Sequence, residues 1–257
     1  MDMRPPIPHE HGAWAQLVIA TGAALVVARA RPAGFWVWMA ALWLAFIAHE
    51  SLLVLLGQRG ARARKDGRTR AWIWLVLLLA GAMAFGLTGL EKASPEARWA
   101  LILPFGCASL LLPGTLRGEE KSLPGEALAA LSLGGAALPL ALRAGVPWMA
   151  AWQLTAGLMT AFLLATLLIR RFLAVLRQRP EPLSALGAAL FTGLGAGMGL
   201  ALLIEGHGLE GLACFPLPLL GFWLFARSWP PHRLKRLGWW LAFGNIATAT
   251  LLVMALR

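Results

Sequence analysis

Apolar residues run along this chain in blocks of about 20 positions, separated by short stretches that contain charged residues, proline or glycine. The blocks are continuously apolar rather than alternating, which favours helices over the strands of a membrane barrel. A helix of about 20 residues rises about 30 Å, enough to cross the hydrocarbon core of a bilayer. The pattern predicts an all-α polytopic membrane protein with about nine transmembrane helices, at about residues 12–28, 33–56, 71–90, 98–115, 124–142, 148–169, 184–204, 210–226 and 237–256.

The connections between these blocks are too short for a soluble domain. The longest polar connection, from Leu56 to Arg70, has about fourteen residues, so residues 1–257 are predicted to form a single transmembrane domain. The first block is the weakest and has the length of a signal peptide. The residues before it carry Arg4 balanced by Asp2 and Glu10, which is a poor positive n-region and favours a retained span.

Composition and charge support a membrane protein and give it an orientation. The chain is 59% hydrophobic and 14% charged, against about 25% charged in soluble domains. Counted over alternate connections, Lys and Arg number 17 on the side of the N-terminus and 6 on the other. This bias predicts a multi-pass protein of the cell inner membrane with its N-terminus inside. Because basic loops that meet anionic membrane lipids explain the net charge of +11, no nucleic-acid partner is expected.

Glycines in the seventh block predict close helix packing. The stretch "FTGLGAGMGLA" contains two overlapping G-x-x-x-G pairs, Gly193 with Gly197 and Gly195 with Gly199. Such pairs let a neighbouring backbone approach closely in a membrane. No strand precedes them and they lie in the middle of the block, which favours packing over a dinucleotide-binding loop.

Ionisable residues inside a bilayer are costly and are therefore candidates for function. His49 and Glu50 lie six or seven residues inside the end of the second block, roughly 10 Å deep at 1.5 Å per residue. A carboxylate at this depth needs a partner or a metal ion. Two interpretations stay open, a catalytic or metal-binding pair and a structural ion pair with an arginine from a neighbouring helix end.

The stretch "PHEHGAW" places His9, Glu10 and His11 directly before the first block, on the side predicted to be cytoplasmic. It is either one wall of a site shared with His49 and Glu50 or a polar helix cap. Pro8 disfavours helix at the preceding residue, and Trp14 suits the membrane interface, so capping remains an alternative.

Further charged residues are predicted on the same side. Arg59 and Arg62 follow the second block, and Arg170 ends the sixth. Arginine in these places either grips an anionic group through two donors or anchors the helix end. Glu120 lies in a loop, and Glu126 lies just inside the fifth block, where an acidic residue also favours a helix start.

Three of these stretches together resemble a known family. "PHEHGAW", the helix of His49 and Glu50 with its arginine-rich exit, and "KSLPGEALAALSL" resemble the YwiC-like family of bacterial membrane proteins. The resemblance covers most of the chain and is most specific at the N-terminal motif. It implies an integral membrane protein and brings no established activity with it.

The predicted spans and orientation also resemble, more distantly, the UbiA superfamily of intramembrane prenyltransferases. This resemblance implies a UbiA-like bundle, with a prenyl diphosphate held through Mg²⁺ and Asp-rich motifs at the cytoplasmic ends of the second and sixth helices. His49 and Glu50 fall at the first of these places, and Arg170 falls near the second.

The chain departs from the UbiA pattern in its carboxylates. Asp occurs only at Asp2 and Asp66, so neither Asp-rich motif is present. Mg²⁺ prefers oxygen ligands and reaches phosphate through carboxylates. Magnesium-diphosphate chemistry would therefore rest on Glu10, Glu50, Glu120 and Glu126.

The sequence thus predicts an intramembrane enzyme or binder for a lipid or isoprenoid, with its site on the cytoplasmic face. The predicted catalytic residues, which would act as acid and base, are His9, Glu10, His11, His49 and Glu50. An anionic lipid or isoprenoid diphosphate would be held by Arg59, Arg62, Glu120, Glu126 and Arg170. A divalent metal, if bound, would take His9, His49 and Glu50. The alternative is a non-catalytic transporter or a partner subunit of a membrane complex, in which the same residues form an ion or docking site.

Overall fold

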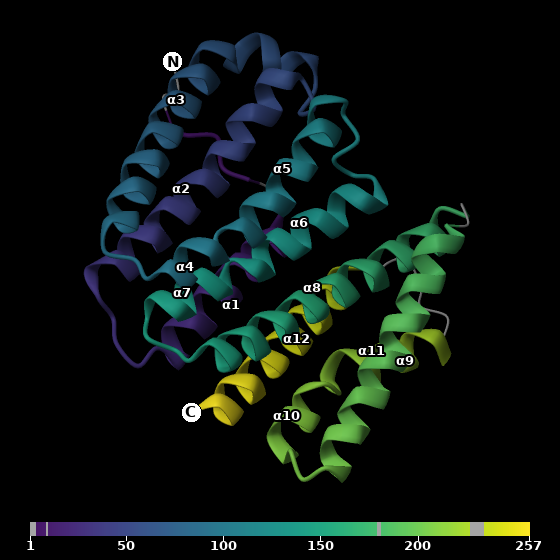
Figure 1. Ribbon diagram of the computed structural model, residues 1–257. Helices are drawn as coiled ribbons and strands as arrows, with labels where there is room; N and C mark the ends of the chain where they lie inside the picture. The colour runs from purple at the N-terminus through teal and green to yellow at the C-terminus, as the bar shows by residue number, and fades with distance from the viewer. Residues whose placement is uncertain (1–3, 9, 179–180, 227–233) are drawn as a thin grey trace.

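The protein is a bundle of α-helices. The computed structural model describes residues 4–8, 10–178, 181–226 and 234–257, and all regular secondary structure in these residues is helical (Figure 1). The helices are α1 (His11–Val27), α2 (Ala33–Leu56), α3 (Ala61–Glu91), α4 (Pro95–Ala100), α5 (Ile102–Leu116), α6 (Leu123–Gly135), α7 (Ala137–Arg143), α8 (Trp148–Leu176), α9 (Pro182–Ile204), α10 (Gly208–Ala213), α11 (Pro216–Ala226) and α12 (Leu234–Leu256).

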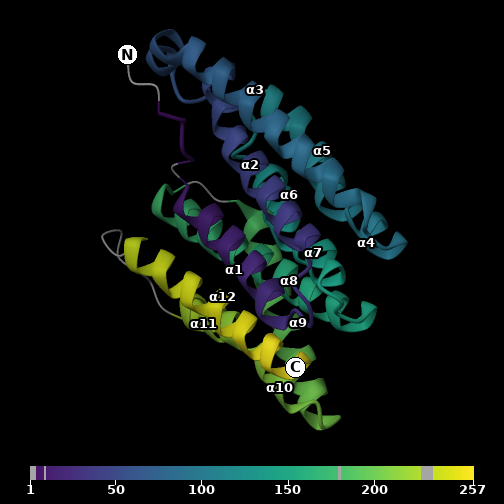
Figure 2. The same cartoon turned by 90° about the vertical axis from the view of Figure 1, so that its left-hand side faces the viewer.

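Eight segments of the described chain are long and apolar enough to cross a membrane. Three of them consist of two consecutive helices each, namely α4 with α5, α6 with α7, and α10 with α11. The first predicted span corresponds to α1, which has 17 residues and is shorter than these segments. It lies between α2 and α12 in Figure 2 and contacts α12, α7 and α6. The prediction of an all-α polytopic membrane protein is confirmed.

Two helices extend beyond the predicted apolar blocks. α3 begins at Ala61 rather than near residue 71, and α8 ends at Leu176 rather than near residue 169. The added residues are rich in Arg, Lys and Ala, which are good helix formers although they are too polar to count toward a span. The predicted fourteen-residue connection after Leu56 was therefore wrong, because only residues 57–60 separate α2 from α3.

The centre of the bundle is formed by α8 with α1, α6 and α12. Leu154, Leu158 and Phe162 of α8 are fully buried in one apolar cluster with residues of these helices. A side chain at Gly134 of α6 would come within 2.9 Å of the Met159 Cα atom of α8. The absence of a side chain there lets the two backbones approach closely.

The glycine prediction for α9 holds for one pair. A side chain at Gly195 would meet Pro218, and one at Gly199 would meet Phe215, so this pair faces α10 and α11. Positions 193 and 197 have open space around them. Of the two predicted glycine pairs, only Gly195 with Gly199 packs closely against another helix of the chain.

Alternate connections gather at opposite ends of the bundle. The segment before α1 and the connections α2–α3, α5–α6 and α8–α9 lie at one end, which we call the basic end, while the connections α1–α2, α3–α4, α7–α8 and α9–α10 lie at the opposite end (Figures 1 and 2). The connections at the basic end are those predicted from the sequence to lie on the side of the N-terminus, where Lys and Arg are more frequent. The candidate residues from distant parts of the sequence are therefore brought to the same end.

Candidate functional site

Arg59 and Glu50 form a close ion pair at the basic end. Gly57 and Gly60 have φ values of +79° and +97°, which only glycine adopts easily, so the chain reverses sharply between α2 and α3. The reversal brings Arg59 back over the end of α2. Its Nε and Nη2 atoms donate to the two carboxylate oxygens of Glu50 at 2.7 and 2.6 Å. Because the Glu50 side chain is only 2% exposed, this two-pronged pair neutralises a buried charge.

Glu10 binds the outer edge of the same guanidinium group. The Nη1 and Nη2 atoms of Arg59 donate to Glu10 Oε1 at 3.3 and 3.2 Å. Glu10 occupies the N-cap position of α1, but its side chain makes no capping hydrogen bond. Trp14 holds this segment against α2 through ring contacts with Trp43 and Phe46. Glu10 is therefore part of a polar cluster and does not act as a side-chain cap.

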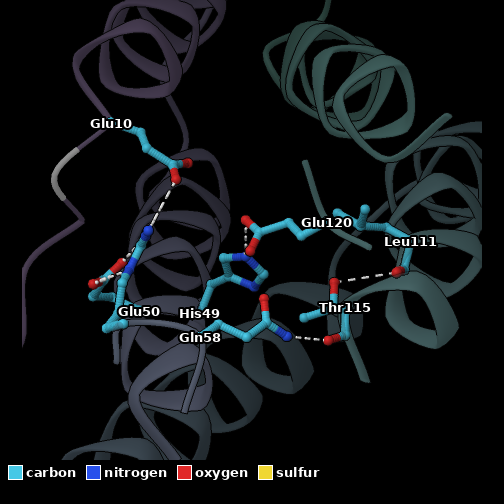
Figure 3. A network of polar contacts seen from close by, with 8 residues as sticks. Glu10, His49, Glu50, Gln58, Leu111, Thr115 and Glu120 are labelled. Carbon is cyan, nitrogen blue, oxygen red and sulfur yellow. Dashed lines mark hydrogen bonds and ion pairs between the residues drawn. The ribbon is translucent and has the colours of Figure 1, made fainter. Parts of the chain in front are cut away.

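His49 faces the loop between α5 and α6. Its Nε2 atom lies 3.1 Å from Glu120 Oε1 (Figure 3), and the two side chains are 32% and 12% exposed. Gly125 lets this loop close over the start of α6, because a side chain there would collide with the Glu120 backbone carbonyl. Gln58 donates to the Thr115 carbonyl and fastens the α2–α3 turn to the end of α5. The His49–Glu120 pair is thus held in place by the α5–α6 loop on one side and by the α2–α3 turn on the other.

Arg170 forms a second cluster that joins α6, α8 and the start of α9. Its Nη1 atom lies 3.0 Å from Glu126 Oε2 and donates to the Lys121 carbonyl at 2.8 Å. Its Nε and Nη2 atoms donate to Glu181 at 3.1 and 2.9 Å. The Arg170 side chain is 13% exposed. All three nitrogen atoms of its guanidinium group therefore contact residues outside α8.

The local charges determine how Glu120 and Arg59 ionise. Burial is the largest single influence on Glu120 and opposes ionisation, but the hydrogen bond with His49 and the charges of His49, Arg59 and Lys121 together hold its pKa below the usual value. The hydrogen bond and charge of Glu50, with the weaker charge of Glu10, raise the pKa of Arg59 further above its usual value despite burial. Both groups are therefore charged at neutral pH.

The described carboxylates do not form a magnesium cradle. Both oxygens of Glu50 accept hydrogen bonds from Arg59, so their lone pairs point at a cation already. Among the residues that the structure describes, no three His, Cys, Asp or Glu side chains gather in a way that suits a metal ion. His9 lies outside the described residues. The metal set of His9, His49 and Glu50 therefore stays a prediction.

The structure brings together most of the predicted site residues, but not all. Glu10, His49, Glu50, Arg59 and Glu120 meet at the basic end, with Glu126 and Arg170 in the second cluster. Arg62 and His11 are placed differently. Arg62 is 97% exposed and pairs with Asp66 at 3.7 Å on the outside of α3. His11 is the exposed first residue of α1.

Sequence reasoning missed Glu181, which binds Arg170 through both carboxylate oxygens. Glu181 directly precedes Pro182, the first residue of α9. An acidic residue followed by proline is a typical helix start, and this signal was visible in the sequence. The pairing of its side chain with Arg170 was not visible, because it depends on how α8 and α9 pack.

Fold and site together define a multi-pass α-helical membrane protein with ion-paired histidine, glutamate and arginine side chains at one end. The family model of YwiC-like proteins matches residues 7–141, just over half of the chain, and the chain belongs to this family. The match includes Glu10, His49, Glu50, Arg59, Glu120 and Glu126, whereas Arg170 and Glu181 lie beyond it. No curated protein and no solved structure matches the chain.

Proposed function

We propose that this YwiC-like protein is an intramembrane enzyme or binder for a lipid or isoprenoid with an anionic head group, which it holds at the basic end. The proposal rests on the fact that Arg59 binds two carboxylates at once, Glu50 on its buried side and Glu10 on its outer edge. Glu50 fixes the guanidinium group from the buried side at 2.6 and 2.7 Å. The outer edge is occupied by Glu10 at 3.2 and 3.3 Å, and that carboxylate is 39% exposed.

Glu10 occupies the place that a substrate anion would take. The Nη1–Nη2 edge of arginine is suited to a phosphate or a carboxylate because its donors lie in one plane. Since Glu10 is bound at longer distances and is far more exposed than Glu50, it is the partner that an incoming phosphate displaces. Arg59 itself stays in position through Glu50.

His49 and Glu120 supply acid–base chemistry beside this anion position. The lowered pKa of Glu120 keeps it ionised at neutral pH, so it can orient the His49 ring through their hydrogen bond. His49 is 32% exposed, which leaves it accessible to a head group. General acid–base catalysis requires such a group within hydrogen-bond reach of the reacting atom.

Location and architecture complete the proposal. The excess of Lys and Arg at the basic end supports a cytoplasmic position for it in the cell inner membrane. His49 and Glu50 on the second span and Arg170 on the sixth support a UbiA-like transferase arrangement. In this version arginine, rather than a metal held by aspartates, binds the anionic head group.

A second candidate is a non-catalytic transporter or a partner subunit of a membrane complex. The Arg170 cluster favours it, because Arg170 on α8 binds Glu126, Glu181 and the Lys121 carbonyl, which lie on other elements, and its side chain is only 13% exposed. In this case the charged residues organise the fold for ion passage or docking. A protein partner that co-purifies in a fixed ratio would support this candidate.

The decisive test is the binding of geranylgeranyl diphosphate to the purified protein in detergent. Glu10→Gln removes the competing charge and should tighten binding about tenfold, which corresponds to about 1.4 kcal/mol. Glu119→Gln removes the same charge from an exposed position in the α5–α6 loop and should change binding less than twofold. If Glu10→Gln leaves the affinity unchanged, or if both variants tighten it equally, the anion position on Arg59 is wrong.

A second measurement separates an enzyme from a binder. His49→Gln should keep the affinity for the diphosphate but abolish turnover. Cells that carry only this variant should therefore accumulate the same lipid as cells that lack the protein. Should His49→Gln restore the wild-type lipid profile fully, the acid–base role of His49 would be refuted while the anion position on Arg59 stands.

A further inference from the structure

A basic recess lies beside the turn between α2 and α3, outside the clusters of Arg59 and Arg170. Its volume is about 370 Å³, and it is open to the surface. It is lined by Leu56, Gly57, Ala61, Arg64, Lys65 and Arg68. This is the size range in which proteins bind small ligands.

The three cations of the recess share one face of α3. Ala61, Arg64, Lys65 and Arg68 follow the spacing i, i+3, i+4 and i+7, which places their side chains on one side of a helix. That side faces the end of α2, because Leu56 and Gly57 line the same recess. The spacing therefore directs three positive charges toward one hollow.

Gly57 makes room for Arg64, which lines the recess. A side chain at position 57 would lie 3.3 Å from Cδ and 3.7 Å from Nη1 of Arg64. The Arg64 side chain thus leans back over the turn, above the apolar end of α2. The recess combines an apolar floor at the end of a membrane span with cationic walls.

These cations lack the carboxylate partners that neutralise Arg59 and Arg170. In the described part of the chain, no carboxylate lies within ion-pair distance of Arg64, Lys65 or Arg68. The acidic residue next to them in sequence, Asp66, pairs with Arg62 on another face of α3. The positive charge of the recess is therefore available to an external anion.

We infer that this recess is a binding site for a phosphate group, carried either by an anionic phospholipid of the adjoining leaflet or by a soluble phosphate ester. Two arginines provide planar pairs of donors for phosphate oxygens, and a lysine adds a third charge. Basic clusters next to a membrane span attract anionic head groups. The apolar floor at Leu56 allows a glycerol or acyl segment to remain at the membrane end of the recess.

This site is separate from the proposed function at Arg59. The lining residues make none of the contacts that hold Glu10, His49, Glu50 or Glu120. Removal of the recess charges should leave diphosphate binding at Arg59 unchanged within twofold. Failure of one proposal therefore does not decide the other.

The test uses the full chain reconstituted in vesicles of equal parts phosphatidylcholine and phosphatidylglycerol, followed by native mass spectrometry of the extracted protein. The triple variant Arg64→Gln, Lys65→Gln, Arg68→Gln should retain about tenfold less phosphatidylglycerol, the loss expected for about 1.4 kcal/mol. The matched triple variant Arg117→Gln, Arg177→Gln, Lys235→Gln removes the same charges from exposed positions in other helices and connections. It should retain phosphatidylglycerol within twofold of the unchanged protein.

Two outcomes would overturn the site. Equal losses in both triple variants would mean that only the total charge of the surface matters. No loss of phosphatidylglycerol in the recess variant, together with glycerol 3-phosphate binding equal to that of the unchanged protein, would mean that the recess binds no phosphate group. Glycerol 3-phosphate, added to the unchanged protein, identifies the carrier: displacement of the lipid supports a soluble ester, and retention supports the head group. All six positions are exposed, so the variants should fold, and an unchanged Tm confirms it.

Discussion

At the basic end, Arg59 and Arg170 bind carboxylates from other elements of the chain, whereas at the opposite end Arg98 and Arg257 donate to backbone carbonyls. Arg98 reaches the carbonyl of Glu91 at 3.3 Å, and Arg257 reaches that of Val26 at 2.8 Å. Both carbonyls belong to the last turn of a helix, where four acceptors have no partner within the helix. The opposite end thus uses arginine to complete helix ends.

The basic end differs because its charges are paired across the bundle and partly buried. Glu50 is 2% exposed and Arg170 is 13% exposed. The contacts of Arg98 and Arg257 at the opposite end are exposed to solvent, and exposed charged contacts contribute little to stability. Buried pairs are costly to form and costly to break. The difference indicates that the basic end is where the chain maintains a specific arrangement of charge, as a site requires.

The largest expected effect is that of Arg59→Ala. It leaves the buried Glu50 charge without its partner, so we expect a loss of about 3–5 kcal/mol in the free energy of unfolding. Thermal unfolding in detergent measures the change. Arg62→Ala, which removes the same charge from an exposed position three residues away, should stay within about 0.5 kcal/mol.

A double variant sharpens this test. Arg59→Met with Glu50→Met removes both charges and should recover most of the lost stability, because a buried ion pair can be replaced by apolar residues at little cost. If Arg59→Ala proves as mild as Arg62→Ala, the Arg59–Glu50 pair does not hold the end of α2.

Arg170→Ala should have an intermediate effect. Its carboxylate partners Glu126 and Glu181 are 34% and 41% exposed, so water can partly replace the arginine, and we expect a loss of about 1–3 kcal/mol. Unfolding under the same conditions checks this, with Arg98→Ala from the opposite end as the comparison, expected within about 0.5 kcal/mol. Equal losses at Arg98 and Arg170 would remove the distinction between the two ends.

The smallest effect concerns pH and Glu120. Because the pKa of Glu120 is lowered in the folded protein, its ionised form contributes stability above the ordinary glutamate pKa of about 4.3. That contribution is lost as pH falls from there through the lowered pKa of the folded state. Unfolding measured across this range should show a steeper loss for the unchanged protein than for Glu120→Gln. Parallel curves for the two proteins would contradict the His49–Glu120 pairing.

Part of the site could be predicted from the sequence, because a charged residue inside an apolar block is visible in the sequence itself. Glu50 stands inside an apolar block, so its need for a partner followed from its position alone. Its partner was not predictable, since Arg59 and Arg62 are equivalent in sequence terms. The turn at Gly57 and Gly60 directs Arg59 toward Glu50, while the helical phase of α3 turns Arg62 outward to Asp66. The two arginines differ in role because Arg59 lies in the turn between α2 and α3, whereas Arg62 lies on α3 itself.

The sequence by itself determined the class of protein, eight of its spans, and the end at which the candidate residues gather. These follow from hydropathy and from the alternation of charge, which add up residue by residue along the chain. Only the tertiary structure decided that Glu10, at the start of α1, meets Arg59, and that Arg170 meets Glu126 and Glu181. Such pairs depend on helix register, packing distance and the direction of each turn, which no single stretch of sequence contains.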